Sequence, residues 1–136
     1  MRRLFAILLC VTATSCERSP SATQNVSGDK IDPASLAFVG KVWLTADFAR
    51  PKGTVRIFLP DGTLVMDSCF ETYRLTKWLP RSAEKIVWRE DRAPIEAEVE
   101  QRTPKDLILK MHLPHEIREE EYILASVPYV CPDMPR

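Results

Sequence analysis

The stretch Ile95-Glu96-Ala97-Glu98-Val99-Glu100 alternates apolar and acidic residues without a break. Successive side chains of a β-strand point to opposite faces, so Ile95, Ala97 and Val99 would face a core while the glutamates face water. Apart from one turn of helix that we expect within residues 34–39, no segment after residue 16 repeats apolar residues with the period of a helix. The pattern predicts an all-β domain.

A turn with a clear mechanism joins two further strands. Apolar runs at residues 54–59 and 63–68 flank Pro60-Asp61-Gly62. Proline presets φ and glycine accepts a positive φ, so this segment predicts a β-hairpin. Similar runs, separated by proline, aspartate or charged residues, predict further strands at residues 41–46, 70–78, 85–90, 106–112 and 121–130.

Eight short sequential strands favour a small antiparallel up-and-down barrel, because closing the sheet removes its exposed edges. The aromatic residues of these strands could line a small apolar cavity or an interaction face. They are also large enough to fill a barrel of this size, and filling is the arrangement that we favour. These residues are Trp43, Phe58, Phe70, Tyr73, Trp78, Trp88, Tyr122 and Tyr129.

The first residues have the three-part layout of an export signal. Arg2 and Arg3 precede an apolar run at residues 4–11, and small residues follow at 12–15. The apolar run is too short to span a bilayer, because a transmembrane helix needs about 20 residues. We therefore interpret residues 1–15 as a signal peptide that is removed.

The segment Ala13-Thr14-Ser15-Cys16 resembles the lipobox of bacterial lipoproteins. This resemblance implies cleavage before Cys16 and acyl chains, palmitate among them, on that cysteine. More than one chain is needed for stable anchoring. Glu17, in place of aspartate, implies anchoring at the periplasmic face of the outer membrane. The alternative is a secreted protein that is cleaved near Ser15 and carries no lipid.

Cysteine counting agrees with an exported lipoprotein. Cys10 would leave with the signal peptide, so the mature chain keeps Cys16, Cys69 and Cys131. If Cys16 is acylated, Cys69 and Cys131 remain as a pair in an oxidising compartment, where disulfides form and persist. A metal site that uses both thiolates is the alternative, but no Cys-x-x-Cys spacing supports it.

Composition bounds the rest of the chain. Residues 16–35 are rich in Ser, Thr, Pro and Asp, which is typical of a linker. Residues 36–136 are enough for one small barrel domain and too few for two. The mature chain holds 17 basic and 19 acidic residues without a basic stripe, so no nucleic-acid partner is indicated.

The segment Gly40-Lys41-Val42-Trp43 resembles the Gly-x-Trp start of the first strand in lipocalin-like barrels. The domain also resembles the small META-type lipoproteins of Gram-negative bacteria. These resemblances cover residues 40 to about 131. They imply a barrel in which Trp43 plugs the closed end. The alternative is that Trp43 is an ordinary core residue.

Few residues are arranged for chemistry. His112 and His115 are three apart, but Pro114 prevents a helix that would point them together, and no third ligand follows at a fixed spacing. The acidic run at residues 119–121 could bind a cation weakly, but we interpret it as the solvated start of a strand. No motif of a nucleophile, zinc site or phosphate loop occurs, and no carboxylate lies in the apolar context that shifts a pKa for acid–base work.

Two classes of function therefore remain. The first is a tethered binding or interaction module without catalysis or cofactor, which would hold a small apolar ligand or dock onto an envelope protein, as barrel-shaped lysozyme inhibitors do. The second is a metal-handling or envelope-stress lipoprotein of the copper-response type. The second class requires thiol or imidazole ligands, and the expected disulfide and the missing Cys-x-x-Cys spacing count against it.

Overall fold

The computed structural model describes residues 30–131. The predicted signal peptide, the predicted lipidation site at Cys16 and most of the predicted linker lie outside the described residues, as do residues 132–136. Within the described part, no helix has the length and apolarity to cross a membrane.

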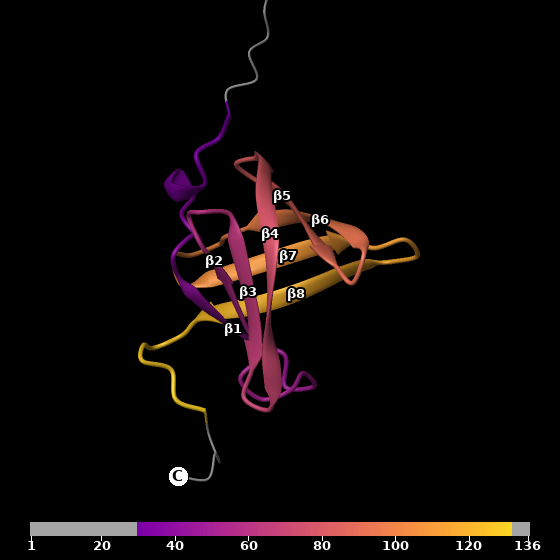
Figure 1. The fold of residues 1–136 in the computed structure, drawn as a ribbon. Coiled ribbons are helices and arrows are strands. Elements are labelled where there is room, and N and C mark those ends of the chain that lie inside the picture. Colours follow the sequence, from indigo (N-terminus) through magenta and orange to yellow (C-terminus); the bar gives the residue numbers. More distant parts are fainter. Residues whose placement is uncertain (1–29, 132–136) are drawn as a thin grey trace, which may run out of the picture.

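The described chain forms eight antiparallel strands in sequence order, and β1 pairs with β8 to close a barrel. Figure 1 shows the arrangement. The strands are β1 (Val42–Thr45), β2 (Val55–Phe58), β3 (Thr63–Ser68), β4 (Glu71–Ser82), β5 (Lys85–Glu90), β6 (Ala93–Glu100), β7 (Asp106–His112) and β8 (Ile117–Leu124). The predicted fold class, an all-β up-and-down barrel of eight strands, is confirmed.

The alternation that predicted the fold is visible in β6. Ile95, Ala97 and Val99 are buried in the core. Glu96 and Glu98 face outward, where Glu98 forms a surface ion pair with Lys85. The period of two therefore places every second side chain of this strand inside the barrel.

Several strand ends differ from the prediction. β4 continues past residue 78 to Ser82 and includes Pro80, which the ladder tolerates because the register shifts between Pro80 and Ser82. β8 begins at Ile117, earlier than expected, because residues 113–116 form a tight turn in which the Leu113 amide bonds to the Glu116 carbonyl. It ends at Leu124, so the expected strand at 125–130 is wrong. Instead of the helical turn expected within residues 34–39, a short 3₁₀ helix, η1 (Pro33–Ser35), begins just before that range and ends at Ser35; Asp32 caps it.

Aromatic side chains close one end of the barrel. The rings of Phe38, Phe58 and Trp78 meet with centroids 5.2 to 5.8 Å apart, and all three are buried. The indole N–H of Trp43 donates to the Phe38 carbonyl, and that of Trp78 donates to the Leu59 carbonyl. We call this the aromatic end. The N-terminal part of the described chain, with η1, enters the barrel here, at the top of Figure 1.

Three of the eight aromatic residues expected in the interior are not there. Phe70 and Tyr73 are exposed, and Tyr129 lies in the segment after β8. The other five, together with aliphatic side chains, form one core that fills the middle of the barrel.

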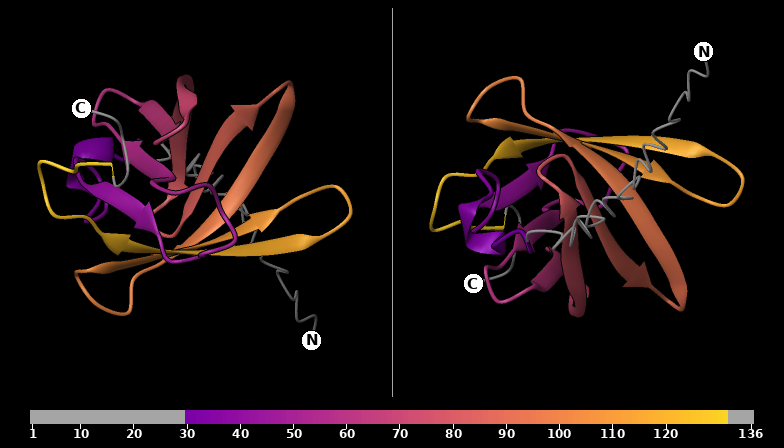
Figure 2. Two further views of the ribbon diagram at one scale, coloured as in Figure 1. Left: turned by 90° about the horizontal axis from the view of Figure 1, so that it is seen from below. Right: turned by 90° about the horizontal axis from the view of Figure 1, so that it is seen from above.

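The strands separate at the opposite end. β4 pairs with β5 only from Trp78 onward, so its first half, Glu71 to Lys77, pairs with β3 alone. The β5–β6 and β7–β8 hairpins diverge toward their turns (Figure 2). The interior of the barrel is therefore accessible at this end, which we call the charged end.

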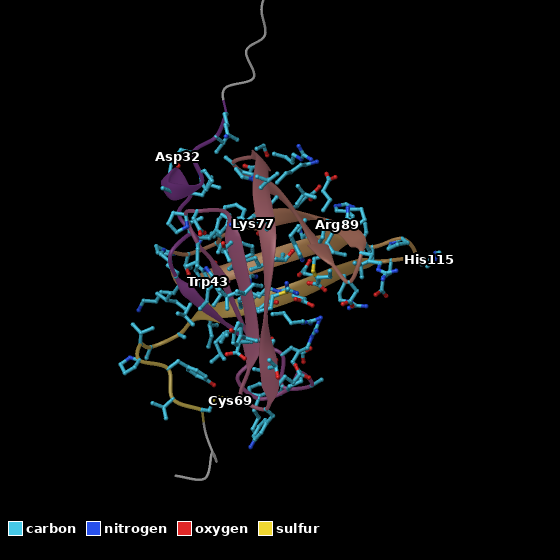
Figure 3. The ribbon with its side chains drawn as sticks, viewed as in Figure 1. Asp32, Trp43, Cys69, Lys77, Arg89 and His115 are labelled. Atoms are coloured by element: carbon cyan, nitrogen blue, oxygen red, sulfur yellow. A yellow bond between two sulfur atoms is a disulfide. The ribbon has the colours of Figure 1, made fainter. Side chains whose placement is uncertain are left out.

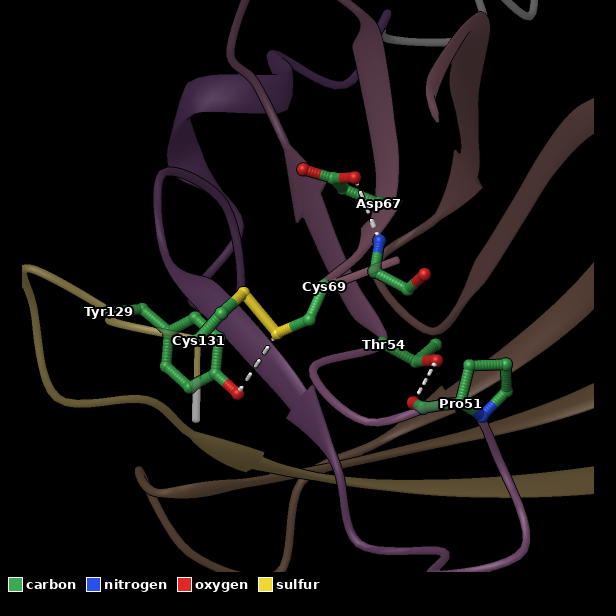
Figure 4. Close-up of a disulfide and its surroundings, with 7 residues drawn as sticks. Pro51, Thr54, Asp67, Cys69, Tyr129 and Cys131 are labelled. Atoms are coloured by element: carbon green, nitrogen blue, oxygen red, sulfur yellow. Dashed lines mark hydrogen bonds between the residues drawn. A yellow bond between two sulfur atoms is a disulfide. The ribbon is translucent and has the colours of Figure 1, made fainter. Parts of the chain in front are cut away.

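A disulfide joins Cys69 to Cys131, with 5.5 Å between the Cα atoms. The predicted pairing is confirmed, and Cys131 lies beyond the end of β8. The bond holds the segment after β8 against the β3–β4 turn, and the Cys69 amide donates to the Lys52 carbonyl of the β1–β2 loop. Figure 4 shows Tyr129 beside the disulfide, with its hydroxyl 3.9 Å from Cys69 Sγ. Three segments of the charged end are thus fastened together.

Candidate functional site: a charged pocket at one end of the barrel

Arg56 points into the barrel from β2 and is only 7% exposed. Its Nε donates to the Tyr122 hydroxyl at 2.6 Å, one terminal nitrogen donates to Glu90 at 3.1 Å, and the other donates to Glu120 at 3.2 Å. The guanidinium also lies 5.3 Å from the ring centroid of Trp88. Burying a charge is costly unless it is paired and hydrogen-bonded, and Arg56 meets both conditions.

Glu120 is the common acceptor of the cluster. It lies on the inward face of β8 with Tyr122, and it is buried. Besides Arg56, it accepts hydrogen bonds from Tyr122 and from Arg50 of the β1–β2 loop. Glu90, at the end of β5, accepts a further bond from the Trp88 indole at 2.9 Å. We call Arg50, Arg56, Glu90, Glu120 and Tyr122 the buried network.

The surroundings fix the protonation of the buried network. Burial opposes the charge on Arg56, but Tyr122, Glu120 and Glu90 outweigh it and raise the pKa of Arg56. Burial, helped by Glu120, raises the pKa of Tyr122. Burial also acts to raise the pKa of Glu90, yet Arg56 and the Trp88 indole overcome it and leave that pKa below its ordinary value. At neutral pH, Arg56 and Glu90 are therefore ionised, and Tyr122 is neutral.

A pocket of about 250 Å³ opens beside the buried network. Its apolar wall is formed by Ile95, Met111 and Leu113, and Arg74 and Arg118 also line it. Arg74 shares a face of β4 with buried Trp78, and Arg118 shares a face of β8 with Tyr122. Both arginines therefore belong to the inward faces of their strands, although the separation of the strands leaves them accessible.

A β-bulge shapes the rim of this pocket. The register of β3 and β4 shifts between Met66 and Ser68, so that Glu71 lies opposite the buried Ser68. Bulges re-aim side chains in this way. Glu71 consequently joins the pocket lining from the first position of β4.

The two histidines do not come together. His112 lies on the outer side of β7, 3.6 Å from Glu98, whereas His115 projects from the tip of the β7–β8 turn (Figure 3). Among residues 30–131, no group of three or more histidine, cysteine, aspartate or glutamate side chains is placed to hold a metal ion.

The expectation for the acidic run at 119–121 is wrong at its middle residue. Glu119 and Glu121 are exposed, but Glu120 is buried and bound by two arginines. Glu120 and Tyr122 lie two residues apart, a spacing that places them on the same face of a strand and could have predicted the burial of Glu120. The charged residues on either side of Glu120 concealed this pattern.

Comparisons with known proteins give no relative. No family model matches the chain, and neither a curated protein nor a solved structure matches it.

Proposed function

We propose that this protein is an exported, lipid-anchored binding module without catalytic activity, which takes its ligand at the charged end of the barrel. The signal-like residues 1–15 and the lipobox-like sequence before Cys16 support the anchor. The disulfide supports export, because such bonds persist in oxidising compartments, and it leaves Cys16 as the single cysteine for acylation in the processed chain. The proposed location is the periplasmic face of the outer membrane.

The observation that carries the binding proposal is the pocket beside buried Arg56. Elsewhere the interior is filled by packed side chains, so we place the ligand at the charged end rather than in the middle of the barrel. The described chain enters the barrel at the aromatic end (Figure 1), and the pocket lies at the opposite end. A pocket with an apolar wall and a few polar groups is the usual form of a small-ligand site.

The anchor is tested by metabolic labelling with radioactive palmitate. We expect label on the wild-type protein, and none on Cys16→Ser, which should accumulate as soluble protein in the periplasm. Cys69→Ser is the matched control, because it removes a cysteine of the disulfide and should keep the label. Label on Cys16→Ser would contradict the assignment.

Binding is tested by native mass spectrometry of processed Cys16→Ser protein, incubated with a metabolite extract of the cells that express it. We expect bound mass on this protein and none after Leu113→Trp, which fills the pocket. Leu79→Trp is the control, because Leu79 is exposed on the outside of β4. The proposal fails if no bound mass depends on Leu113.

A further inference from the structure

The charges that line the pocket fall into two groups. Arg50, Arg56, Glu90 and Glu120 are bound to one another in the buried network. A second group, Arg74, Arg118, Glu71 and Asp67, also lines the pocket, and its members form no hydrogen bond or ion pair with these four residues of the buried network. The second group is the part of the lining that a ligand can engage without breaking buried ion pairs.

The present partners of the two arginines are weak competitors. Arg74 lies 3.9 Å from Asp91, and these side chains are 59% and 95% exposed. Arg118 pairs with Glu116, and these side chains are 48% and 54% exposed. Exposed ion pairs contribute about 0–1 kcal/mol, so a ligand carboxylate that forms two parallel bonds to a guanidinium can replace them.

Glu71 supplies the opposite charge on the same rim. The bulge turns it toward the inward face of the sheet, and no described residue forms an ion pair with it. It is also exposed, so its carboxylate is available to a ligand ammonium group. Between these charges the wall is apolar, with Ile95 and Met111 almost fully buried and Leu113 partly buried.

We propose that the pocket binds a zwitterionic ligand, namely an apolar amino acid or short peptide with free termini. Its carboxylate would lie against Arg74 and Arg118, its ammonium group against Glu71, and its side chain against Met111 and Leu113. Two guanidinium groups, with the carboxylates of Glu71 and Asp67 on the same rim, surround an apolar wall and match this ligand in charge and polarity. This inference rests on the proposed function, since it names the ligand class of the same pocket.

Four dipeptides test the assignment, each titrated calorimetrically into processed Cys16→Ser protein. Leu-Leu carries both terminal charges. N-acetyl-Leu-Leu keeps only the negative carboxylate, Leu-Leu amide keeps only the positive ammonium group, and N-acetyl-Leu-Leu amide carries no terminal charge. We expect Leu-Leu to bind most tightly. Loss of either terminal charge should weaken binding roughly tenfold, because a hydrogen bond to a charged group is worth at least that factor.

Variants assign each charge to its residue. Arg74→Gln and Arg118→Gln should each weaken Leu-Leu and N-acetyl-Leu-Leu about tenfold and leave Leu-Leu amide unchanged. Glu71→Gln should weaken Leu-Leu and Leu-Leu amide only. Arg102→Gln is the matched control, because Arg102 is 57% exposed, pairs with Glu121 and lies outside the pocket lining. Arg102→Gln should leave the affinity for all four peptides unchanged.

The failures can be told apart. Equal binding of all four peptides would overturn the zwitterion proposal while the binding function stands. If no peptide binds, but mass spectrometry shows mass that depends on Leu113, the ligand class is wrong and the site is right. If neither experiment detects binding, the proposed function is wrong as well.

Discussion

At the aromatic end, three rings and two indole hydrogen bonds close the barrel. At the charged end, Arg56 is buried under two carboxylates and a tyrosine, next to an open pocket. Apolar contacts add stability in proportion to the area that they bury, whereas a buried ion pair gives little net stability once desolvation is counted. The comparison indicates that the aromatic end stabilises the fold and that the charged end serves another purpose.

The largest expected effect lies at the aromatic end. Trp78→Ala should lower the free energy of unfolding by about 3–5 kcal/mol, because it removes a fully buried indole and leaves a cavity beside Phe38 and Phe58. Guanidinium unfolding with the disulfide intact measures this. A loss below about 1 kcal/mol, the size of an ordinary substitution, would show that this end does not hold the barrel together.

The charged end should respond differently to single and double changes. Arg56→Met should lower the free energy of unfolding by about 3 kcal/mol, because the negative charges of Glu120 and Glu90 remain after their cationic partner is removed. Arg56→Met/Glu120→Leu should recover much of that loss, because apolar residues often replace a buried pair without cost. Denaturant midpoints of both variants provide the test. Additive losses in the double variant would mean that the network is a main source of stability.

Two glycines with nearly equal φ angles, one at each end of the barrel, allow a direct comparison of the two ends. Gly53 has φ +73° and would place a Cβ 2.1 Å from Cys69 Sγ, whereas Gly40 has φ +72° and open space around it. Each change to alanine should lower the free energy of unfolding by about 1–2 kcal/mol, because a residue with a Cβ is strained in the left-handed backbone conformation. Gly53→Ala should cost about 1–3 kcal/mol more, because the disulfide must move. Equal losses in thermal unfolding would show that the β1–β2 loop does not pack tightly on the disulfide.

The smallest effect concerns pH. The folded state holds the pKa of Glu90 below its ordinary value of 4.5, so ionised Glu90 stabilises the fold above that pH. This contribution is lost as the pH falls through the folded pKa. The difference in unfolding free energy between wild type and Glu90→Gln should be constant well above pH 4.5 and shrink as the pH falls below that value. A difference that stays the same in acid would argue against the Arg56–Glu90 pair.

The sequence was sufficient to predict the barrel, because the alternation of apolar and polar residues is visible within a single strand. Ile95, Ala97 and Val99 show their inward face within six residues, and Pro60-Asp61-Gly62 carries its own turn. The ends of β4 and β8 were missed because a bulge, a proline in the ladder and a tight turn depend on the neighbouring strand.

The pocket was not predictable by the same means. Arg56 lies between Val55 and Ile57, and Glu120 lies between two other glutamates, so neither shows its burial in the local pattern. Their pairing joins positions that are 64 residues apart in the chain. Only the register of the closed barrel brings these charges together.

The most direct test of the division between the two ends uses the three tryptophans. The Trp88 indole N–H bonds to Glu90 at the charged end, and those of Trp43 and Trp78 bond to carbonyls at the aromatic end. In a ¹⁵N-labelled sample titrated with Leu-Leu, the account predicts a saturable shift of the Trp88 indole signal while the other two stay in place. Shifts of the Trp43 or Trp78 signals without that of Trp88, or no shift at all, would contradict it.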